Sequence, residues 1–353
     1  MAAVTDTMRA YRLLRWGEQP KLVEVPAPVP GPGQVVVRVA GCGLCHSDLD
    51  MMAMPGEVGE HLGWQIPFTL GHETAGWVAA VGDGVVGVAE GDPVAVSSPS
   101  SCGECRWCRA GRDNACPNGL VGRGYGRDGG LADQVLVDDV RSVLPLAPGV
   151  DPATAGPLTD AGATSFHAVR RVLPRVRDDG TVVVVGAGGL GILVVQILRA
   201  LSGASVIAID PDPVRRDLAL RYGAAGAIDG VRAGTGRELA QVVGADGADA
   251  VIDLVGTDET IGVAVRSCGA GGAVAVVGAA GGSLRRAWYG GLPRDGEVFT
   301  FQGSDLADAR AVLDLAATGA LEVPIVAFAL DDVVDAYAAL RAGGLSGRIV
   351  VGP

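Results

Sequence analysis

The first third of the chain alternates short valine-rich runs with glycine and proline turns. Examples are PGPGQVVVRVAGCG, GHETAGWVAAVGDGV and EGDPVAVSSPSSCG. Short apolar runs bounded by turn residues are typical of strands, so this region predicts a compact antiparallel β domain. The pattern ends near Pro145.

From about Thr181 the pattern changes to apolar strands separated by helical stretches. The strands TVVVVGAG, ASVIAID, ADAVIDLVG, GGAVAVVGAA and EVFTFQGS form a βαβ series, which predicts a parallel sheet covered on both faces. After Gln302, DLADARAVLDLAATGAL predicts an amphipathic helix. A strand around Val323, a helix over residues 333–341 and a final GRIVVGP follow.

Length and composition limit the class of protein. At roughly 150 residues per domain, 353 residues predict about two domains. Hydrophobic residues make up 48% of the chain and its mean hydropathy is +0.33, which supplies sizeable cores and excludes disorder as the main state. The 28 basic against 40 acidic residues give a net charge of -12, which repels nucleic acid and favours a small-molecule partner.

Two stretches bear on location. Residues 1–20 lack the uninterrupted apolar run of a signal peptide, so we expect a cytoplasmic protein. The most apolar stretch, residues 182–198, is short for a membrane span and contains VGAGGLG. It predicts a buried strand, a glycine turn and a helix, and therefore no membrane association.

Four cysteines have the spacing of a metal site in CGECRWCRAGRDNAC. Short turns let four thiolates converge on one tetrahedral ion, and zinc suits such ligands. Because four protein ligands leave no open position, this zinc is expected to be structural. Disulfides are disfavoured in a chain without an export signal, and an iron–sulfur cluster is the remaining alternative. The four residues are Cys102, Cys105, Cys108 and Cys116.

The run of valines at residues 182–185 is followed by GAGGLG and a helical stretch, which is the context that a dinucleotide-binding fingerprint requires. Gly186 permits the tight turn, Gly188 the approach of a pyrophosphate, and Gly191 the packing of helix on strand. The helix N-terminus then faces the phosphates. Gly189 and Leu190 complete the loop.

Asp210 ends the next strand, about twenty residues after the glycines, where a carboxylate can accept hydrogen bonds from the adenosine ribose. It repels a 2′-phosphate, so NAD is favoured over NADP. Arg215 and Arg216 nearby keep NADP possible. The alternative role for Asp210 is that of a helix N-cap before Pro211.

Two further motifs, GLCHSD and PFTLGHETAG, contain Cys45 and His72. Alone, such residues are more often a small buried thiol and a structural histidine. Together with the four-cysteine loop and GAGGLG, in this order, they resemble the zinc-dependent medium-chain alcohol dehydrogenases nearly end to end.

The resemblance implies a GroES-like barrel domain over residues 1–158, a six-stranded Rossmann domain over 159–302, and a segment 303–353 that completes the first domain. It also implies an active site in the cleft between the domains and a homodimer or homotetramer.

By this resemblance, a second, catalytic zinc is bound by Cys45, His72 and Asp160, and Glu73 is an acid near the metal. PLTDAG, with Asp160 where many members have cysteine, resembles the bacterial secondary-alcohol dehydrogenases. Cysteine, histidine and aspartate leave one position open for substrate oxygen. The resemblance also implies cofactor contacts from six further residues. These are His46 and Arg348 at the phosphates, Thr164 at the nicotinamide, and Val255, Val277 and Ala279 along the nicotinamide end.

The expected chemistry is hydride transfer between NAD(H) and an alcohol, ketone or aldehyde, with zinc polarising the substrate oxygen. Ser47 begins the proton relay by the resemblance, but Asp50 stands where several relatives complete it with histidine. Ser98 occupies a pocket position that is aromatic in some primary-alcohol enzymes, which favours secondary alcohols and ketones. The alternatives are a polyol dehydrogenase, a catalytically idle NAD- and zinc-binding relative, and a zinc-independent quinone reductase.

Overall fold

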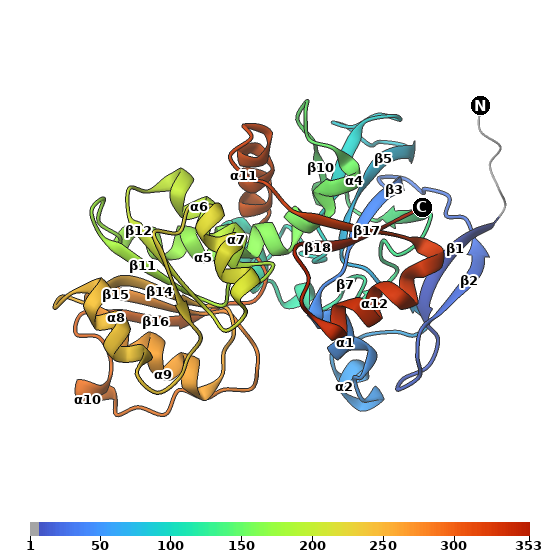
Figure 1. Cartoon of the computed structure of the whole chain (residues 1–353). Coiled ribbons are helices and arrows are strands. Elements are labelled where there is room, and N and C mark those ends of the chain that lie inside the picture. The colour runs from blue at the N-terminus through green and yellow to red at the C-terminus, as the bar shows by residue number, and fades with distance from the viewer. Residues whose placement is uncertain (1–6) are drawn as a thin grey trace. The chain divides into compact units, whose positions relative to one another are not determined.

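A computed structural model of the chain describes residues 7–353 (Figure 1). The predictions that involve residues 1–6, at the start of the first domain and of the stretch lacking a signal peptide, lie outside the described residues. The chain divides into two compact units. The first comprises Met1–Asp160, Ser304–Ala317 and Val323–Pro353, and the second comprises Ala161–Gly303 and Thr318–Glu322.

The first unit is built mainly from antiparallel strands. A three-stranded sheet has the order β2-β1-β4, and a seven-stranded sheet has the order β10-β6-β5-β3-β18-β17, with β9 paired to β3. The short strands β7 and β8 form a separate two-stranded parallel sheet. The strands are β1 (Thr7–Leu13), β2 (Lys21–Pro26), β3 (Val35–Gly43), β4 (Phe68–Thr69), β5 (Glu73–Val81), β6 (Pro93–Val96), β7 (Gly122–Arg123), β8 (Gly126–Arg127), β9 (Gln134–Val137), β10 (Val143–Pro145), β17 (Ile325–Ala329) and β18 (Arg348–Gly352).

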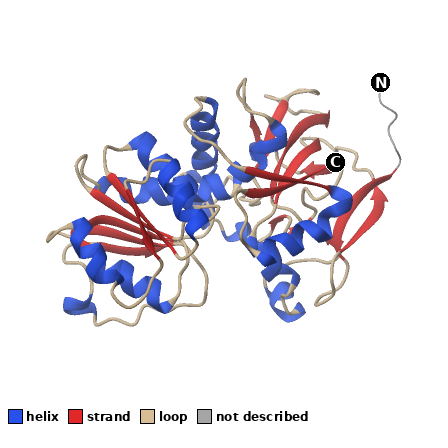
Figure 2. Ribbon diagram, viewed as in Figure 1, coloured by secondary structure: helices blue, strands red, loops and turns tan. Residues whose placement is uncertain are grey.

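Helices in the first unit are short, apart from two near the end of the chain. Figure 2 shows them in blue against the red strands. They are α1 (His46–Met52), α2 (Gly56–His61), α3 (Arg106–Arg109), α4 (Pro152–Ala155), α11 (Leu306–Ala317) and α12 (Val333–Ala342), with 3-10 turns η1 (Asp113–Ala115), η2 (Pro117–Leu120), η3 (Val140–Ser142), η4 (Gly156–Thr159) and η6 (Leu330–Asp332).

The C-terminal segment completes the core of this unit. β18 pairs antiparallel with β3, so that Val351 lies opposite Cys42. Helix α12 buries Ala336, Tyr337 and Leu340 in the same core that holds the valines of β3. This spacing places the three side chains on one face of the helix. The end of β3, where Cys45 follows, is therefore flanked by β5 on one side and β18 on the other.

The second unit is a six-stranded, entirely parallel sheet with the order β13-β12-β11-β14-β15-β16. Its central strands are apolar and buried on both faces, because helices cover both of them. In Figure 1, α5, α6 and α7 lie on one face, and α8 and α9 lie on the other. The strands are β11 (Thr181–Val185), β12 (Ser205–Asp210), β13 (Gly226–Asp229), β14 (Ala248–Asp253), β15 (Cys268–Val276) and β16 (Glu297–Thr300), and the helices are α5 (Ala161–Val172), α6 (Gly191–Leu201), α7 (Pro213–Arg221), α8 (Thr235–Val243), α9 (Asp258–Ser267) and α10 (Trp288–Gly291), with η5 (Leu173–Arg175).

The predicted fold class is confirmed: a parallel doubly wound sheet is accompanied by a β-rich unit. The helix expected after Gln302 is α11, and the strand expected around Val323 begins at Ile325. The apolar stretch at residues 182–198 forms β11, the glycine turn and most of α6. Within residues 7–353, no helix combines the length and apolarity needed to cross a bilayer.

Candidate active site and metal centres

Four of the predicted metal-site residues meet in the first unit. Cys45 is the N-cap of α1, His72 immediately precedes β5, Glu73 is the first residue of β5, and Asp160 follows η4. One ligand atom from each lies within 4.8 Å of every other. Residues from three distant segments of the chain thus converge on one point.

His72 is oriented by the groups on either side of its ring. Its Nδ1 lies 3.0 Å from Asp48 Oδ1, while Nε2 lies 3.5 Å from Asp160 Oδ2 and 3.4 Å from Ser47 Oγ. Burial lowers the pKa of His72, but the carboxylates of Asp48 and Asp160 outweigh it and hold the pKa well above its ordinary value. Because Asp48 occupies Nδ1, the ring nitrogen that faces the other candidate ligands is Nε2. The hydroxyl of Ser98 donates to the backbone carbonyl of His72 from the buried side.

Glu73 and Arg348 form a buried ion pair beside this cluster. Glu73 is fully buried and Arg348 is 8% exposed, and the guanidinium donates directly to the carboxylate. Burial raises the pKa of Glu73 to about 7, although the charge of Arg348 acts in the opposite direction. Arg348 is the first residue of β18, which places it in the interior rather than at the surface.

The donor set fits a zinc ion. A thiol, an imidazole and a carboxylate are the groups that bind zinc, and they converge without a disulfide to Cys45. Burial raises the pKa of Asp160, but the hydrogen bond and charge of His72 outweigh it and the net shift is downward, which keeps the carboxylate ionised. Glu73 Oε2 is buried and has no hydrogen-bond partner. Arg348 binds the other oxygen of this carboxylate, so Oε2 remains available to a cation bound at the cluster.

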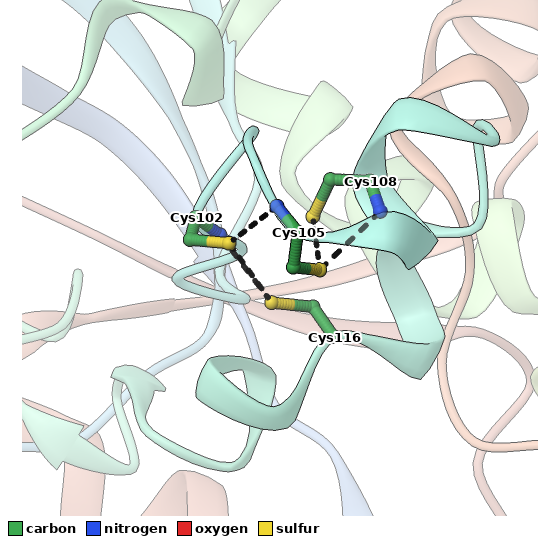
Figure 3. Close-up of side chains that lie close together, drawn as sticks. All are labelled: Cys102, Cys105, Cys108 and Cys116. Carbon is green, nitrogen blue, oxygen red and sulfur yellow. Dashed lines mark hydrogen bonds between the residues drawn. The ribbon is translucent and has the colours of Figure 1, made fainter.

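The four cysteines of the loop also converge, as Figure 3 shows. The sulfur atoms of Cys105 and Cys108 lie 3.6 Å apart, and those of Cys102 and Cys116 lie 3.7 Å apart. A disulfide requires about 2.05 Å, whereas thiolates around a tetrahedral zinc at 2.3 Å lie about 3.8 Å apart. All four are free thiols, so the disulfide alternative is wrong for this loop.

Backbone N–H groups support thiolates in this loop. Cys102 Sγ accepts a hydrogen bond from the N–H of Cys105, and Cys105 Sγ accepts one from the N–H of Cys108. Hydrogen bonds from the backbone of Glu104 and Cys105 lower the pKa of Cys102 to about 7. Burial raises the pKa of Cys108 to about 12, and a cation at the centre would offset this shift. The four sulfur atoms and these N–H groups thus have the arrangement that a bound metal ion would require.

The glycine loop of the second unit has the geometry that a pyrophosphate requires. Gly186 has φ +91°, and a Cβ at Gly191 would collide with the carbonyl oxygen of Gly186, so both positions require glycine. At Gly188, by contrast, a Cβ would meet nothing closer than the guanidinium of Arg215 at 3.8 Å. The folded chain itself leaves space open at Gly188, at the N-terminus of α6, where a phosphate fits.

Asp210 braces this loop from the end of β12. Its Oδ2 accepts a hydrogen bond from the N–H of Ala187 at 2.8 Å, and its Oδ1 accepts one from the N–H of Asp212 at 2.9 Å. The alternative role as a helix cap is wrong, because Asp212 is the N-cap of α7 and accepts from the N–H of Val214. Each oxygen of Asp210 keeps a lone pair for a ribose hydroxyl.

The two arginines near Asp210 differ. The guanidinium of Arg216 donates hydrogen bonds to the carbonyl oxygens of Asp210 and Pro211 and to the carboxylate of Asp229. Arg215 makes only long ion pairs, 3.9 Å to Asp210 and 3.7 Å to Asp212. Arg215 is therefore the more available of the two to a bound nucleotide.

The remaining predicted cofactor residues divide between the units. Val255 follows β14, and Val277 and Ala279 follow β15, at the same carboxyl edge of the sheet as the glycine loop. Val255 lies directly against the Gly186 turn. Thr164 is buried on α5 in the second unit, whereas His46, which opens α1, and Arg348 belong to the first unit.

Asp48 is a site residue that the sequence analysis missed. It lies three residues after Cys45 and is fully buried, and its carboxylate contacts both Cys45 and His72. An acidic residue three positions after a helix N-cap is typical of a capping box, and this was the available signal.

Comparison with known proteins agrees with the fold. The alcohol dehydrogenase GroES-like domain matches residues 31–148, and the zinc-binding dehydrogenase domain matches residues 189–318. An NAD-dependent alcohol dehydrogenase of Sulfurisphaera tokodaii is 37% identical over 79% of this chain and 80% of its own length. A D-arabinose 1-dehydrogenase (NADP(+)) of Saccharolobus solfataricus is 31% identical over 98% and 97%.

Solved structures of related proteins have the same fold. The alcohol dehydrogenase of Aeropyrum pernix superposes with a TM-score of 0.89 at 31% identity, covering 98% of this chain and 100% of that one. The acetophenone reductase of Geotrichum candidum, in complex with NAD, has a TM-score of 0.86 at 28% identity, covering 100% and 99%.

A GroES-like domain joined to a Rossmann sheet, with zinc-type ligands, defines a zinc-binding dehydrogenase. The chain belongs to the zinc-dependent medium-chain alcohol dehydrogenase family. It is an enzyme, an oxidoreductase of the zinc- and NAD-binding type, as the sequence predicted.

Proposed function

We propose that this enzyme transfers hydride between NAD(H) and a secondary alcohol or ketone. The observation that carries the proposal is the convergence of Cys45, His72 and Asp160 within 4.8 Å of one another. Two further observations support the substrate class: the PLTDAG motif, and the similarity to an acetophenone reductase, whose name identifies a ketone as its substrate.

When bound, zinc supplies Lewis acidity toward the substrate oxygen. Cys45, His72 and Asp160 would hold it. The exposed hydroxyl of Ser47, 3.4 Å from His72 Nε2, takes the proton of the alcohol and passes it to solvent. Glu73 stays beside the ligands, held by Arg348.

The cofactor is held by the carboxyl edge of the parallel sheet. Gly186, Gly188 and Gly191, with Gly189 and Leu190 between them, cradle the pyrophosphate, and Asp210 binds the adenosine ribose. Val255, Val277 and Ala279 line the nicotinamide end, with Thr164 as a polar contact. His46, Arg215 and Arg348 supply positive charge or hydrogen-bond donors toward the phosphates.

The same proposal covers organisation and stoichiometry. Residues 1–158 and 303–353 form the catalytic domain, and residues 159–302 form the NAD-binding domain, although Thr318–Glu322 clusters with the second unit. Each chain binds two zinc ions, one at each cluster, and the enzyme is a cytoplasmic homodimer or homotetramer. The net charge of -12 supports a small-molecule substrate rather than nucleic acid.

The test is NADH and NADPH oxidation by the purified full chain with a panel of ketones, aldehydes and keto sugars, with zinc per chain determined on the same sample. We expect NADH-dependent ketone reduction and two zinc ions per chain. Turnover confined to keto sugars and their polyols would instead identify the enzyme as a polyol dehydrogenase. One zinc per chain would refute the open metal site.

Coenzyme preference gives a sharper prediction. Asp210→Asn removes the charge that repels a 2′-phosphate but keeps an oxygen for the N–H of Ala187. We expect the ratio of kcat/KM for NADH to that for NADPH to fall about tenfold. The matched control is Asp212→Asn, since asparagine caps α7 as well as aspartate does. An unchanged ratio in Asp210→Asn would mean that another group sets the preference.

A further inference from the structure

Asp48 connects the two halves of the candidate metal site in the first unit. Its Oδ2 accepts a hydrogen bond from the N–H of Cys45 at 3.0 Å, and its Oδ1 lies 3.0 Å from His72 Nδ1. Two predicted ligands are thus positioned by one carboxylate. In a metal-binding histidine, the N–H of the ring nitrogen that does not bind the metal commonly donates a hydrogen bond to such a group. This hydrogen bond fixes the tautomer and the orientation of the imidazole.

The Asp48 carboxylate has an unusual environment for a buried charge. It is 0% exposed, and among residues 7–353 no lysine or arginine forms an ion pair with it. A buried carboxylate without a lysine or arginine partner depends on hydrogen-bond donors and on its histidine neighbour. Asp48 Oδ1 is buried without a hydrogen-bond partner in the described part of the chain, and so is the hydroxyl of Tyr337, which interacts electrostatically with this carboxylate.

Tyr337 is well placed to be a donor to Asp48. It lies on α12, is 1% exposed, and stacks on Tyr11 with ring centroids 5.8 Å apart. Its hydroxyl therefore needs a hydrogen-bond acceptor, and the unpartnered oxygen of Asp48 is one that it can serve. Burial and the charge of Asp48 raise the pKa of Tyr337 well above its ordinary value, so the hydroxyl keeps its proton.

We propose that Tyr337 is a positioning residue of the catalytic metal site, which acts through Asp48 on the orientation of His72. The inference deepens the proposed function and rests on it, since it takes His72 as a metal ligand. The stack on Tyr11 fixes the ring, the hydroxyl fixes the carboxylate, and the carboxylate fixes the imidazole so that Nε2 points to the metal. Tyr337 comes from the C-terminal segment, so metal binding depends on a residue far from the ligands in sequence.

Tyr337→Phe tests the proposal, because it removes the hydroxyl and retains the ring. The full-length enzyme is loaded with zinc and titrated with a chelator, and in parallel the catalytic site is loaded with Co²⁺ and its visible spectrum recorded. We expect the affinity for the catalytic metal to fall about tenfold and the cobalt bands to shift. The matched control is Tyr11→Phe, which removes the hydroxyl from the other ring of the same stack and should leave both readouts unchanged.

The route through Asp48 is tested by a double-mutant cycle with Asp48→Asn. If Tyr337 acts through Asp48, the loss of metal affinity in the double variant equals that of Asp48→Asn alone. Independent, additive losses would refute the route, and wild-type metal affinity with an unshifted cobalt spectrum in Tyr337→Phe would refute the role. Thermal denaturation of each variant separates these outcomes from general destabilisation. A wild-type enzyme that binds only one zinc would instead refute the proposed function itself.

Discussion

Replacing Cys45 by alanine is expected to remove one zinc ion per chain and to lower kcat/KM for ketone reduction about 10³-fold. The metal contributes several kcal/mol of transition-state stabilisation, and each 1.36 kcal/mol is about a factor of ten in rate. The remaining residues at the site, His72, Asp160 and Glu73, no longer surround the metal on every side. Zinc analysis and steady-state kinetics on the same preparation measure both effects.

The matched control is Cys42→Ala, three residues earlier in the chain. Cys42 is fully buried on β3 and interacts with Thr74, and it belongs to neither cluster of ligands. We expect this variant to keep two zinc ions and nearly full kcat/KM, with a modest loss of stability from the small cavity. If Cys45→Ala also kept both ions and its activity, the open metal site would be misassigned.

Removing the metal of the four-cysteine loop is expected to lower the stability of the enzyme. In Cys105→Ala the four-cysteine loop loses a ligand, and the zinc no longer links Cys102 to Cys116. A covalent link across a loop of this size contributes about 3 kcal/mol by the loop-entropy model, and each kcal/mol shifts the Tm of a domain of this size by about 2–4 °C. We therefore expect the Tm to fall by about 6–12 °C, with kcat nearly unchanged at low temperature.

Cys268→Ala is the control for this experiment. Cys268 is partly buried in the second unit and lies outside the metal clusters found among residues 7–353. Differential scanning calorimetry of the two variants, with zinc determined on each, compares the same substitution with and without a ligand role. Equal Tm values and two zinc ions in Cys105→Ala would show that the loop does not depend on the metal.

The features that could be predicted from the sequence depend on local chemistry. The spacing of Cys102, Cys105 and Cys108 brings their sulfur atoms together through one short helix, whatever surrounds it. The glycine loop is likewise determined by β11, the turn at Gly186 and α6. A pattern within about twenty residues contains such sites almost completely.

The features that the sequence did not reveal depend on contacts between distant segments. Arg348 pairs with Glu73 across a separation of 275 residues, and no local pattern shows that the pair is buried. Tyr337 is one apolar position among several on α12, and only the packed core places its hydroxyl beside Asp48. Asp210 was expected to face the cofactor, but its bracing of the loop through the N–H of Ala187 required the β-strand register.

The pairing of β18 with β3 also has a consequence for the time course of biosynthesis. At about 5–20 residues per second, a ribosome reaches Arg348 about 10–60 s after Glu73, given the 275 residues between them. During that interval β3 lacks its β18 neighbour, and Glu73 lacks its counter-ion. The parallel sheet, by contrast, is continuous in the chain from β11 to β16 and has all its strands earlier. The nascent chain therefore contains all six strands of the parallel sheet before β18 is available to complete the sheet of the first unit.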